Sequence, residues 1–536
     1  EQEIYDGKKG DVLQKAIKTV VAYGELFGAQ KLVDLGGAPH LAVSWGSDGV
    51  EPLLKIYKQL AEAGLKTYAP FTADPKPMDP VHLPVTDQEQ AAVDKIYNRM
   101  DELAELNMKL AAEEQEIYDG KKGDVLQKAI KTVVAYGELF GAEKLVDLGG
   151  APHLAVSWGS DGVEPLLKIY KQLAEAGLKT YAPFTADPKP MDPVHLPVTD
   201  QEQAAVDKIY NRMDELAELN MKLGMRSKKD WSCACYLPEM GNTPNRGDNL
   251  AWSESSAINY VNSVIGARTN RNSMGVDMLC DILGKAPQFG LLTDEGRQAV
   301  WLIEVKTTKL PHPEMIGSAI GLKCMEDVPY ITGMDRFISG IDEQSSGYLK
   351  DLGAATASNG ALGLYHMEGV TPEAVDKGRA LLNEGYQTYV IDDAELERIY
   401  KTYPNLWKDK HGTPQRVFLG CPHMSYGQMV EWGKRIVDAM EKAGKDKIGV
   451  PSYMFGSQYV KDAFEKKNPE VAKKLKGYGV SIPINCPMMW CSTPVEGAEL
   501  VATNSNKTRV YTTARFFFDD VLTELIVTGT LPADVA

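Results

Sequence analysis

The stretch Val417-Phe418-Leu419-Gly420-Cys421-Pro422-His423 places a cysteine directly after a short apolar run. Three apolar residues closed by glycine and proline are typical of a buried strand that ends at Leu419. The proline turns the chain away, so the thiol of Cys421 is expected to point into a crevice at the end of the strand. In an open parallel sheet, the carboxyl ends of the strands form the edge where ligands bind.

A second cysteine, Cys486, stands before a proline in the same way, after a predicted strand at 480–484. A third, Cys233, lies in a polar segment at 224–300 that is rich in glycine, asparagine, arginine and serine, as binding sites often are. Three such thiols can hold an iron–sulfur cluster and leave one iron open as a Lewis acid toward a substrate hydroxyl. The alternative is that they are ordinary buried cysteines.

The number and spacing of all the cysteines limit the roles that they can have. The chain has seven cysteines, an odd number, and no paired CxxC motifs, so neither a disulfide scaffold nor a zinc site is expected. Cys235 and Cys491 lie close enough in sequence to be alternative ligands, whereas Cys280 and Cys324 are predicted to be structural. Reduced thiols fit a cytoplasmic protein.

Strand and helix patterns alternate around these motifs. Strands are predicted at 145–148, 362–366, 388–391, 417–419, 448–450 and 480–484, and helices at about 124–134, 163–176, 199–222, 255–265, 426–443 and 458–466, with a further helix starting at Pro372. This alternation predicts an α/β protein with layered domains and parallel sheets.

Length and charge argue against several classes of protein. A chain of 536 residues suggests several domains. It has no apolar run of the roughly 18–20 residues that a membrane span needs, and no signal peptide is visible. The net charge of −16 disfavours a nucleic acid or an anionic membrane as partner.

Residues 1–110 recur at 114–223 with one difference, Gln30 against Glu143. Repeats that stack into solenoids are shorter and diverge, so this copy is either very recent or an artefact. The first copy has no cysteine and is predicted to be redundant. The functional unit then comprises an N-terminal part at 111–360, which contains the polar segment 224–300, and a C-terminal part at 361–536.

Polar residues at helix and strand ends supply candidates for substrate binding. Two arginines at the end of the predicted helix at 255–265 can clamp a carboxylate, although a solvated helix terminus is the alternative. Lys507 lies in a loop after a strand-like run. The predicted substrate-binding residues are Ser255, Arg268, Asn270, Arg271 and Lys507.

Candidates for proton transfer are fewer. His153 and His366 are potential acid–base groups, with a hydrogen-bonded structural histidine as the alternative for each. The sequence contains no P-loop, no GxGxxG and no HExxH motif. The predicted catalytic residues are His153, Ser157, Glu254 and Ser505.

Taken together, the segments resemble the aconitase X family over nearly all of 108–530. The resemblance is carried by Trp252-Ser253-Glu254-Ser255-Ser256-Ala257, Gly266-Ala267-Arg268-Thr269-Asn270-Arg271, Gly420-Cys421-Pro422-His423 and Thr503-Asn504-Ser505 with Lys507. It implies an aconitase-like fold with α/β/α layers and an iron–sulfur cluster (4Fe–4S or 2Fe–2S) on Cys233, Cys421 and Cys486. It also implies dehydration of a small hydroxy acid such as cis-3-hydroxy-L-proline or 5-phosphomevalonate.

In this family a swivelling domain supplies the catalytic base on a serine-rich loop. No such loop is found here, so a separate small subunit is implied and this chain resembles the large subunit. The chain departs from the family at 290–297, at 512–516 and after Arg271, and these departures bear on the substrate more than on the reaction type. Two other functions are considered: a non-catalytic iron–sulfur regulatory subunit, and a scaffold subunit without a cofactor.

Overall fold

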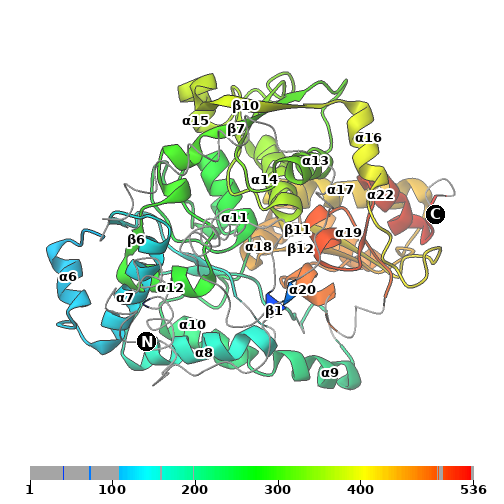
Figure 1. The fold of residues 1–536 in the computed structure, drawn as a ribbon. Coiled ribbons are helices and arrows are strands. Elements are labelled where there is room, and N and C mark those ends of the chain that lie inside the picture. Colours follow the sequence, from blue (N-terminus) through cyan, green and yellow to red (C-terminus); the bar gives the residue numbers. More distant parts are fainter. Residues whose placement is uncertain are drawn as a thin grey trace.

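The computed structural model in Figure 1 describes residues 108–532 except 157, 159, 193, 197, 492 and 494–498, together with Lys18, His40–Leu41 and Thr72–Ala73 of the first copy. Helices of the N-terminal part lie at the left and bottom of Figure 1, one parallel sheet lies at the top, and a second lies at the right. No helix in the described part of the chain is long and apolar enough to cross a membrane.

The first sheet has the order β10-β7-β8-β9 and is parallel throughout. Its strands are β7 (Ala299–Val305), β8 (Pro329–Thr332), β9 (His366–Met367) and β10 (Leu382–Ile391). Helices α13 (Pro313–Cys324) and α14 (Glu343–Gly360) approach each other closely at Gly317. A Cβ at this position would lie only 2.5 Å from the Leu352 carbonyl oxygen, so only glycine fits. The sheet combines strands from both sides of residue 360, where the sequence-based division of the chain was placed.

The strand predicted at 362–366 forms only at its last residue. Side chains from a neighbouring helix hold this backbone instead of a strand ladder: Asn259 Nδ2 donates to the Leu362 carbonyl at 3.0 Å and Asn262 Nδ2 to the Gly363 carbonyl at 2.9 Å. That helix begins as α11 (Ser255–Tyr260) and continues as a π-helical turn at Val261–Ile265, so the helix predicted at 255–265 is confirmed.

The second sheet contains the stretch Val417–His423, which carries Cys421. Its order is β12-β11-β13-β14, all parallel, with β11 (Arg416–Met424), β12 (Ser452–Gly456), β13 (Val501–Thr503) and β14 (Arg515–Phe516). The pairing of β11 with β12 is regular through Leu419 and resumes only at Met424. Cys421 therefore lies in an irregular stretch within β11 rather than after its end.

Two strands predicted for this region are wrong. Residues 448–450 form a bend in which the Gly449 amide donates to the Ile526 carbonyl at 2.7 Å, and β12 starts later, at Ser452. Residues 480–484 run beside β12, with the Ser481 amide donating to the Ser452 carbonyl at 3.1 Å, but they form no regular strand. Pro483 has no amide hydrogen, so the ladder cannot continue there.

Within the N-terminal part, the segment 108–292 has its own hydrophobic core. Its elements are α6 (Ala112–Tyr118), α7 (Asp124–Leu139), β3 (Leu145–Asp147), β4 (His153–Leu154), α8 (Ser160–Glu175), β5 (Thr185–Ala186), α9 (Asp200–Tyr210), α10 (Met213–Lys222), α12 (Met274–Leu283) and β6 (Lys285–Pro287). The helix predicted at 199–222 is thus divided between Tyr210 and Met213. The strand predicted at 145–148 exists, but it pairs antiparallel with β6.

The remaining elements cover the two parallel sheets. They are α15 (Pro372–Lys377), α16 (Asp393–Lys401), α17 (Tyr426–Ala443), α18 (Gln458–Lys467), α19 (Pro469–Tyr478), α20 (Pro487–Cys491), α21 (Asn506–Tyr511) and α22 (Asp519–Thr528). Helix α17 matches its prediction at both ends, because Ser425 and Gln428 form a capping box and Gly444 closes the helix in the left-handed region.

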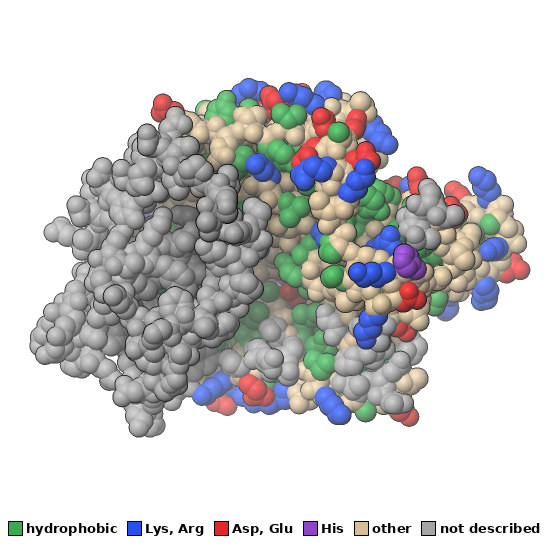
Figure 2. Space-filling model, turned by 45° about the vertical axis from the view of Figure 1, so that its right-hand side comes forward, with side chains coloured by type: hydrophobic (Ala, Val, Ile, Leu, Met, Phe, Trp, Pro, Cys, Tyr) green, Lys and Arg blue, Asp and Glu red, His purple; other side chains and the backbone are tan. Residues whose placement is uncertain are grey.

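The described residues of the first copy repeat one feature of the second. β1 (His40–Leu41) pairs in parallel with β2 (Thr72–Ala73), with His40 opposite Thr72, as His153 lies opposite Thr185 in the pair β4–β5. On the face visible in Figure 2, acidic and basic side chains of the described part are interspersed rather than gathered by sign.

Candidate active site

Three cysteine-bearing loops meet at His423. Its ring nitrogen Nδ1 lies 3.1 Å from Ser232 Oγ, beside Cys233, and Nε2 lies 3.0 Å from the carbonyl of Asn485, beside Cys486. The His423 amide also donates to Cys233 Sγ at 3.4 Å. Burial lowers the pKa of His423 to about 4, so the ring is neutral and acts as a hydrogen-bonding link between the loops.

The loop after β5 completes this arrangement. The Lys189 carbonyl accepts from the Cys486 amide at 2.8 Å, and the Pro190 carbonyl accepts from Asn485 Nδ2 at 3.0 Å. Asp192, also in this loop, accepts from the Ile484 amide at 2.9 Å. The N-terminal part and the second sheet are therefore joined at the cysteines.

The three thiols share one cation. Burial raises the pKa of Cys233, Cys421 and Cys486, and Lys507 counteracts this at each of them. A positive charge among buried thiols favours the thiolate form that iron requires. No three His, Cys, Asp or Glu side chains of the described residues meet closely enough to hold a single ion. Cys421 acts on the pKa of both Cys233 and Cys486, and three neighbouring thiols are the type of donor set that iron–sulfur clusters use.

Lys507 is held by Glu254. The two side chains form an ion pair, and both residues are buried, with exposures of 6% and 5%. Glu254 caps α11 by accepting from the Ala257 amide at 2.7 Å, and it accepts from Ser256 Oγ at 2.7 Å. Burial opposes its charge, but Lys507 and these donors keep the pKa of Glu254 below its ordinary value. Ser255 Oγ lies 3.3 Å from Lys507 Nζ.

His153 has an acidic neighbour that the sequence did not reveal. Its Nδ1 lies 2.9 Å from Thr185 Oγ1 and its Nε2 lies 3.7 Å from Asp187 Oδ1. Burial opposes the charge on His153, but Cys235 and Asp187 outweigh it and raise the pKa of His153 to about 10. The imidazole is therefore protonated near neutral pH. Cys235, an alternative ligand in sequence, instead faces this histidine.

Asp187 connects the histidine with the thiols. Its negative charge raises the pKa of Cys233 and of Cys486. Burial raises the pKa of Asp187 itself; Glu254 adds to this effect, and Lys507 opposes it. The side chain is 16% exposed, more than that of His153. Asp187 was not predicted from the sequence, although its place directly after a short strand is a signal that could have identified it.

The predicted serines have different positions. Ser505 caps α21: its Oγ donates to the Cys421 carbonyl at 2.5 Å and accepts from the Thr508 amide at 3.1 Å. These bonds orient the Cys421 loop and leave the hydroxyl little capacity as a base. Ser157 lies outside the described residues.

The residues of the predicted arginine clamp contact several different segments. Arg268 pairs with Asp294, and both polar groups of Asn270 bind backbone of the 289–291 segment, at 2.9 Å to the Phe289 carbonyl and 2.7 Å from the Leu291 amide. Arg271 lies against Gly363, and Tyr511 acts on its pKa. Arg268 and Asn270 therefore bind the 289–294 segment, and Asp294 lies too far along the chain from Arg268 for their pair to be predicted from the sequence.

The centre of that network is Arg297, whose exposed fraction is only 1%. Its guanidinium binds both carboxylate oxygens of Glu373 and donates to Asn262 Oδ1 at 3.0 Å. His366, a predicted acid–base candidate, lies here as well: Nε2 is 2.8 Å from the Arg297 carbonyl, and burial lowers the pKa of His366 to about 4. It is a structural histidine.

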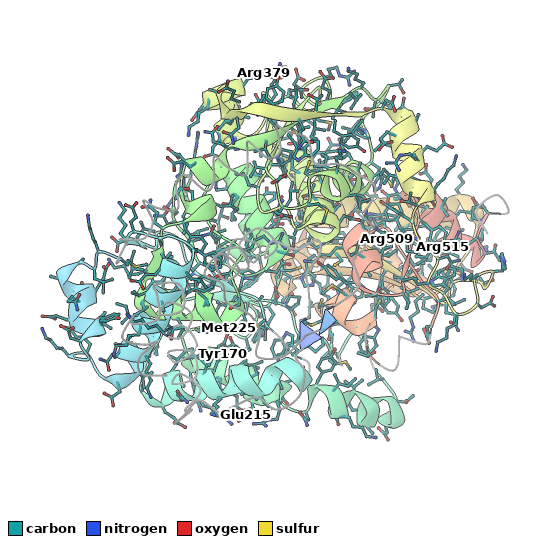
Figure 3. All side chains as sticks on the ribbon, viewed as in Figure 1. Tyr170, Glu215, Met225, Arg379, Arg509 and Arg515 are labelled. Carbon is teal, nitrogen blue, oxygen red and sulfur yellow. The ribbon has the colours of Figure 1, made fainter. Side chains whose placement is uncertain are left out.

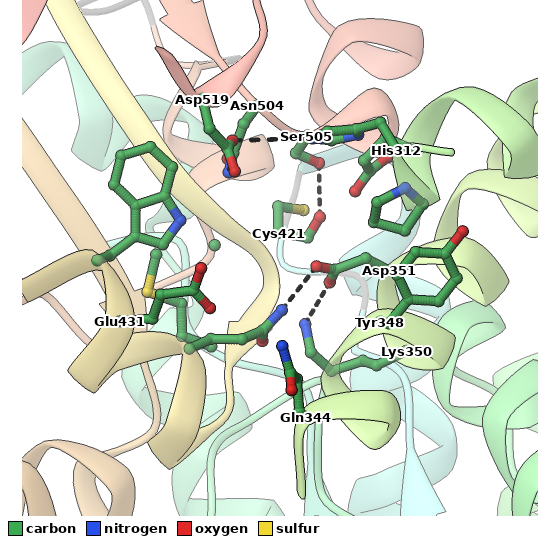
Figure 4. A pocket seen from close by; sticks show the side chains of 16 residues that line it. His312, Gln344, Tyr348, Lys350, Asp351, Cys421, Glu431, Asn504, Ser505 and Asp519 are labelled. Carbon is green, nitrogen blue, oxygen red and sulfur yellow. Dashed lines mark hydrogen bonds and ion pairs between the residues drawn. The ribbon is translucent and has the colours of Figure 1, made fainter. Parts of the chain in front are cut away.

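A cavity of about 210 Å³ adjoins Cys421 at the irregular end of β11 (Figure 4). Figure 4 shows Lys350 and Asp351, which lie 2.6 Å apart, facing it from α14, and Ser505 beside Cys421. Lys507, Glu254 and the other two thiols do not line this cavity. Cys280 and Cys324 lie in the hydrophobic cores, as predicted.

Comparison with known proteins gives this arrangement a class. Residues 107–295 match the model of the aconitase X first domain and residues 299–401 that of the second domain. The large subunit of phosphomevalonate dehydratase from Thermococcus kodakarensis is 30% identical over 75% of this chain and 95% of its own length. The subunit of the same name from Methanosarcina mazei is 28% identical over 75% of this chain and 92% of its own length.

Two further similarities extend the comparison. A cis-3-hydroxy-L-proline dehydratase from Pseudomonas aeruginosa is 29% identical over 60% of this chain, but this covers only 53% of that enzyme. The crystal structure of the holo-form of aconitase X from Thermococcus kodakaraensis superimposes with a TM-score of 0.64 at 27% identity, over 79% of this chain and all of that one.

Parallel α/β domains around a buried lysine and thiols, with dehydratases as relatives, define a hydro-lyase acting on a hydroxy acid. The chain belongs to the aconitase X family, and its extent corresponds to the large subunit. The regulatory and scaffold alternatives have no support among these relatives.

Proposed function

We propose that this chain is the large subunit of a dehydratase that removes water from a small hydroxy acid and carries an iron–sulfur cluster on Cys233, Cys421 and Cys486. The observation that carries the proposal is the buried Lys507–Glu254 pair, whose cation acts on all three thiols. When bound, the cluster supplies an open iron as a Lewis acid for the substrate hydroxyl.

The residues of the chain then have separate tasks. Lys507 binds the substrate carboxylate, with Ser255 as a neighbouring donor, and Glu254 fixes the position of the lysine. His153 holds a proton against Asp187, which makes it a proton donor or a fixed positive charge rather than a base. His423 keeps the three loops in register without changing its charge.

The base that removes the carbon-bound proton is proposed to come from a small subunit. A base must reach that proton at hydrogen-bond distance. Within the described part of the chain, His153 is already protonated and the Ser505 hydroxyl is occupied by its capping bonds. The name "large subunit" of the relatives supports such a partner. A covering subunit would also exclude water from the reaction.

The proposed substrate is 5-phosphomevalonate, because this chain covers nearly the full length of subunits that act on it but only about half of the hydroxyproline enzymes. One observation favours cis-3-hydroxy-L-proline as a second candidate. Asp187 places a carboxylate with 16% exposure beside the thiols, where it could pair with the ring amine of that substrate.

The test is anaerobic reconstitution with iron and sulfide, followed by assays of both substrates with and without the small subunit encoded nearest to this chain. We expect a charge-transfer absorption band that is lost in the C421S variant and retained in C324S, since Cys324 lies in the core of the first sheet. Turnover should require the small subunit. A band that survives in C421S, C233S and C486S alike would contradict the ligand assignment, and full turnover by the chain alone would contradict the two-subunit proposal.

A further inference from the structure

The loop after β5 contains a buried carboxylate whose two oxygens are fully used. Asp192 is 4% exposed. Its Oδ1 accepts from the amides of Val194 and His195, each at 3.2 Å. Its Oδ2 accepts from the Ile484 amide at 2.9 Å and lies 2.7 Å from His195 Nδ1. Each oxygen therefore has two partners, which is the full capacity of a carboxylate oxygen.

His195 has a second partner on a helix of the C-terminal part. Its Nε2 is bonded to Nζ of Lys461 on α18, and Lys461 is 8% exposed. An ammonium group can only donate, so Nε2 must accept and the proton of the neutral ring lies on Nδ1. In this tautomer Nδ1 donates to Asp192. Glu465, one turn further along α18, is 3.8 Å from Lys461 Nζ and half exposed.

The chain of bonds ends at the loop of the third thiol. Ile484, which donates to Asp192, stands two residues before Cys486. The other two bonds between these loops are accepted by main-chain groups, the carbonyls of Lys189 and Pro190. The Asp192 bond, in contrast, is made by a side chain, so substitution can remove it.

We propose that the three side chains Asp192, His195 and Lys461 are positioning residues for the loop of Cys486. Lys461 selects the tautomer of His195, the ring then orients the carboxylate, and the carboxylate holds the Ile484 amide. The loop is thereby arranged for cluster binding before iron arrives. The inference rests on the proposed function in one respect, the assignment of Cys486 as a cluster ligand.

The test compares two variants of His195 that imitate different ring nitrogens. The amide nitrogen of asparagine takes the place of Nδ1, so H195N should still donate to Asp192. The longer glutamine places its amide near Nε2, so H195Q should leave Asp192 without this donor. The variant D192N removes the charge, and its single amide oxygen can accept at most two of the four bonds.

Hydrogen exchange and alkylation of the chain without a cluster measure the position of the loop directly. The Ile484 amide should exchange about tenfold faster in D192N, which weakens a bond to a charged acceptor, and less markedly faster in H195Q. Iodoacetamide should alkylate Cys486, which is partly exposed, faster in the same order. H195N should match wild type in both measurements. After anaerobic reconstitution, iron content and the charge-transfer band should fall in D192N and H195Q but not in H195N.

The matched control is E368Q, which neutralises a carboxylate that accepts from Arg379 at 3.1 Å. Arg379 lies at the upper edge of the molecule in Figure 3, whereas α18 lies near its centre (Figure 1), so E368Q should behave like wild type.

Equal exchange of the Ile484 amide in wild type, D192N and H195Q would overturn the proposal, as would equal behaviour of H195N and H195Q. Should D192N fail to fold, the two His195 variants still decide. The expected exchange pattern in a chain that binds no cluster would uphold the positioning role and overturn the assignment of Cys486 as a ligand.

Discussion

Lys507 pairs with Glu254 and acts on the pKa of all three thiols. Replacing it by methionine leaves Glu254 buried without its cation, and breaking a buried pair in this way costs about 3–5 kcal/mol. We expect K507M to lower the free energy of unfolding by that amount and to abolish measurable dehydration. Thermal unfolding and the anaerobic assay measure the two effects.

The double variant K507M/E254Q separates stability from activity. Removing both charges relieves the uncompensated carboxylate, so most of the lost stability should return while activity stays absent. An active double variant would show that Lys507 does not bind the substrate.

His153 makes stability depend on pH in the alkaline range. Its pKa in the folded state, about 10, lies above its ordinary value of 6.5, so its contribution is complete below about pH 6.5 and is lost as the pH rises toward 10. We expect the free energy of unfolding of H153Q to fall less steeply than that of wild type between pH 7 and 10. Parallel slopes for the two proteins would mean that His153 is neutral in the folded state.

At the scale of elements, the Arg297–Glu373 pair joins three of them: the π-helical turn at Val261–Ile265, the short 3-10 turn at Glu295–Arg297 and helix α15. R297M would leave a buried carboxylate unpaired, and we expect a loss of about 3–5 kcal/mol in urea unfolding. The control is R379M, whose pair with Glu368 is largely exposed and should contribute about 1 kcal/mol or less. Equal losses would show that the buried network contributes little.

The elements also show what the sequence could predict. Helices with clear caps, such as α17, were placed correctly because their signals are local. The strand at 362–366 was misassigned because Asn259 and Asn262, about a hundred residues earlier, bind its backbone. No local pattern reports such a partner.

The same distinction applies to the candidate site. Cys421 and Cys486 could be proposed from their Cys-Pro turns, whereas the choice of Cys233 over Cys235 came from the family resemblance. Lys507 was expected in a loop, but it lies in the first turn of α21. The contacts of Arg268 could not be predicted in that way, because its acidic partners Asp294 and Glu373 are distant in sequence and are brought close only by the fold. Asp187 was missed for the converse reason: it is an ordinary residue in sequence that the fold places beside the thiols.

At the scale of the whole molecule, the duplication gives the chain two nearly identical segments. In the structure it is the second copy whose loop after β5 binds the Cys486 loop through Lys189 and Pro190. The first copy contains the same strand pair, with His40 opposite Thr72. Its sequence therefore carries every residue of that loop but lacks the chain connection to Cys233.

This predicts that the first copy adds nothing to activity. A chain beginning at Met108 should retain its iron content and its turnover with the small subunit, because it keeps all seven cysteines, Glu254 and Lys507.

The duplication also offers matched variants. H153Q and D187N should impair turnover, whereas the equivalent changes H40Q and D74N in the first copy should leave it unchanged. If H40Q and D74N were the impaired pair, the first copy would be the one that occupies the site, and the truncated chain would then depend on the second copy replacing it.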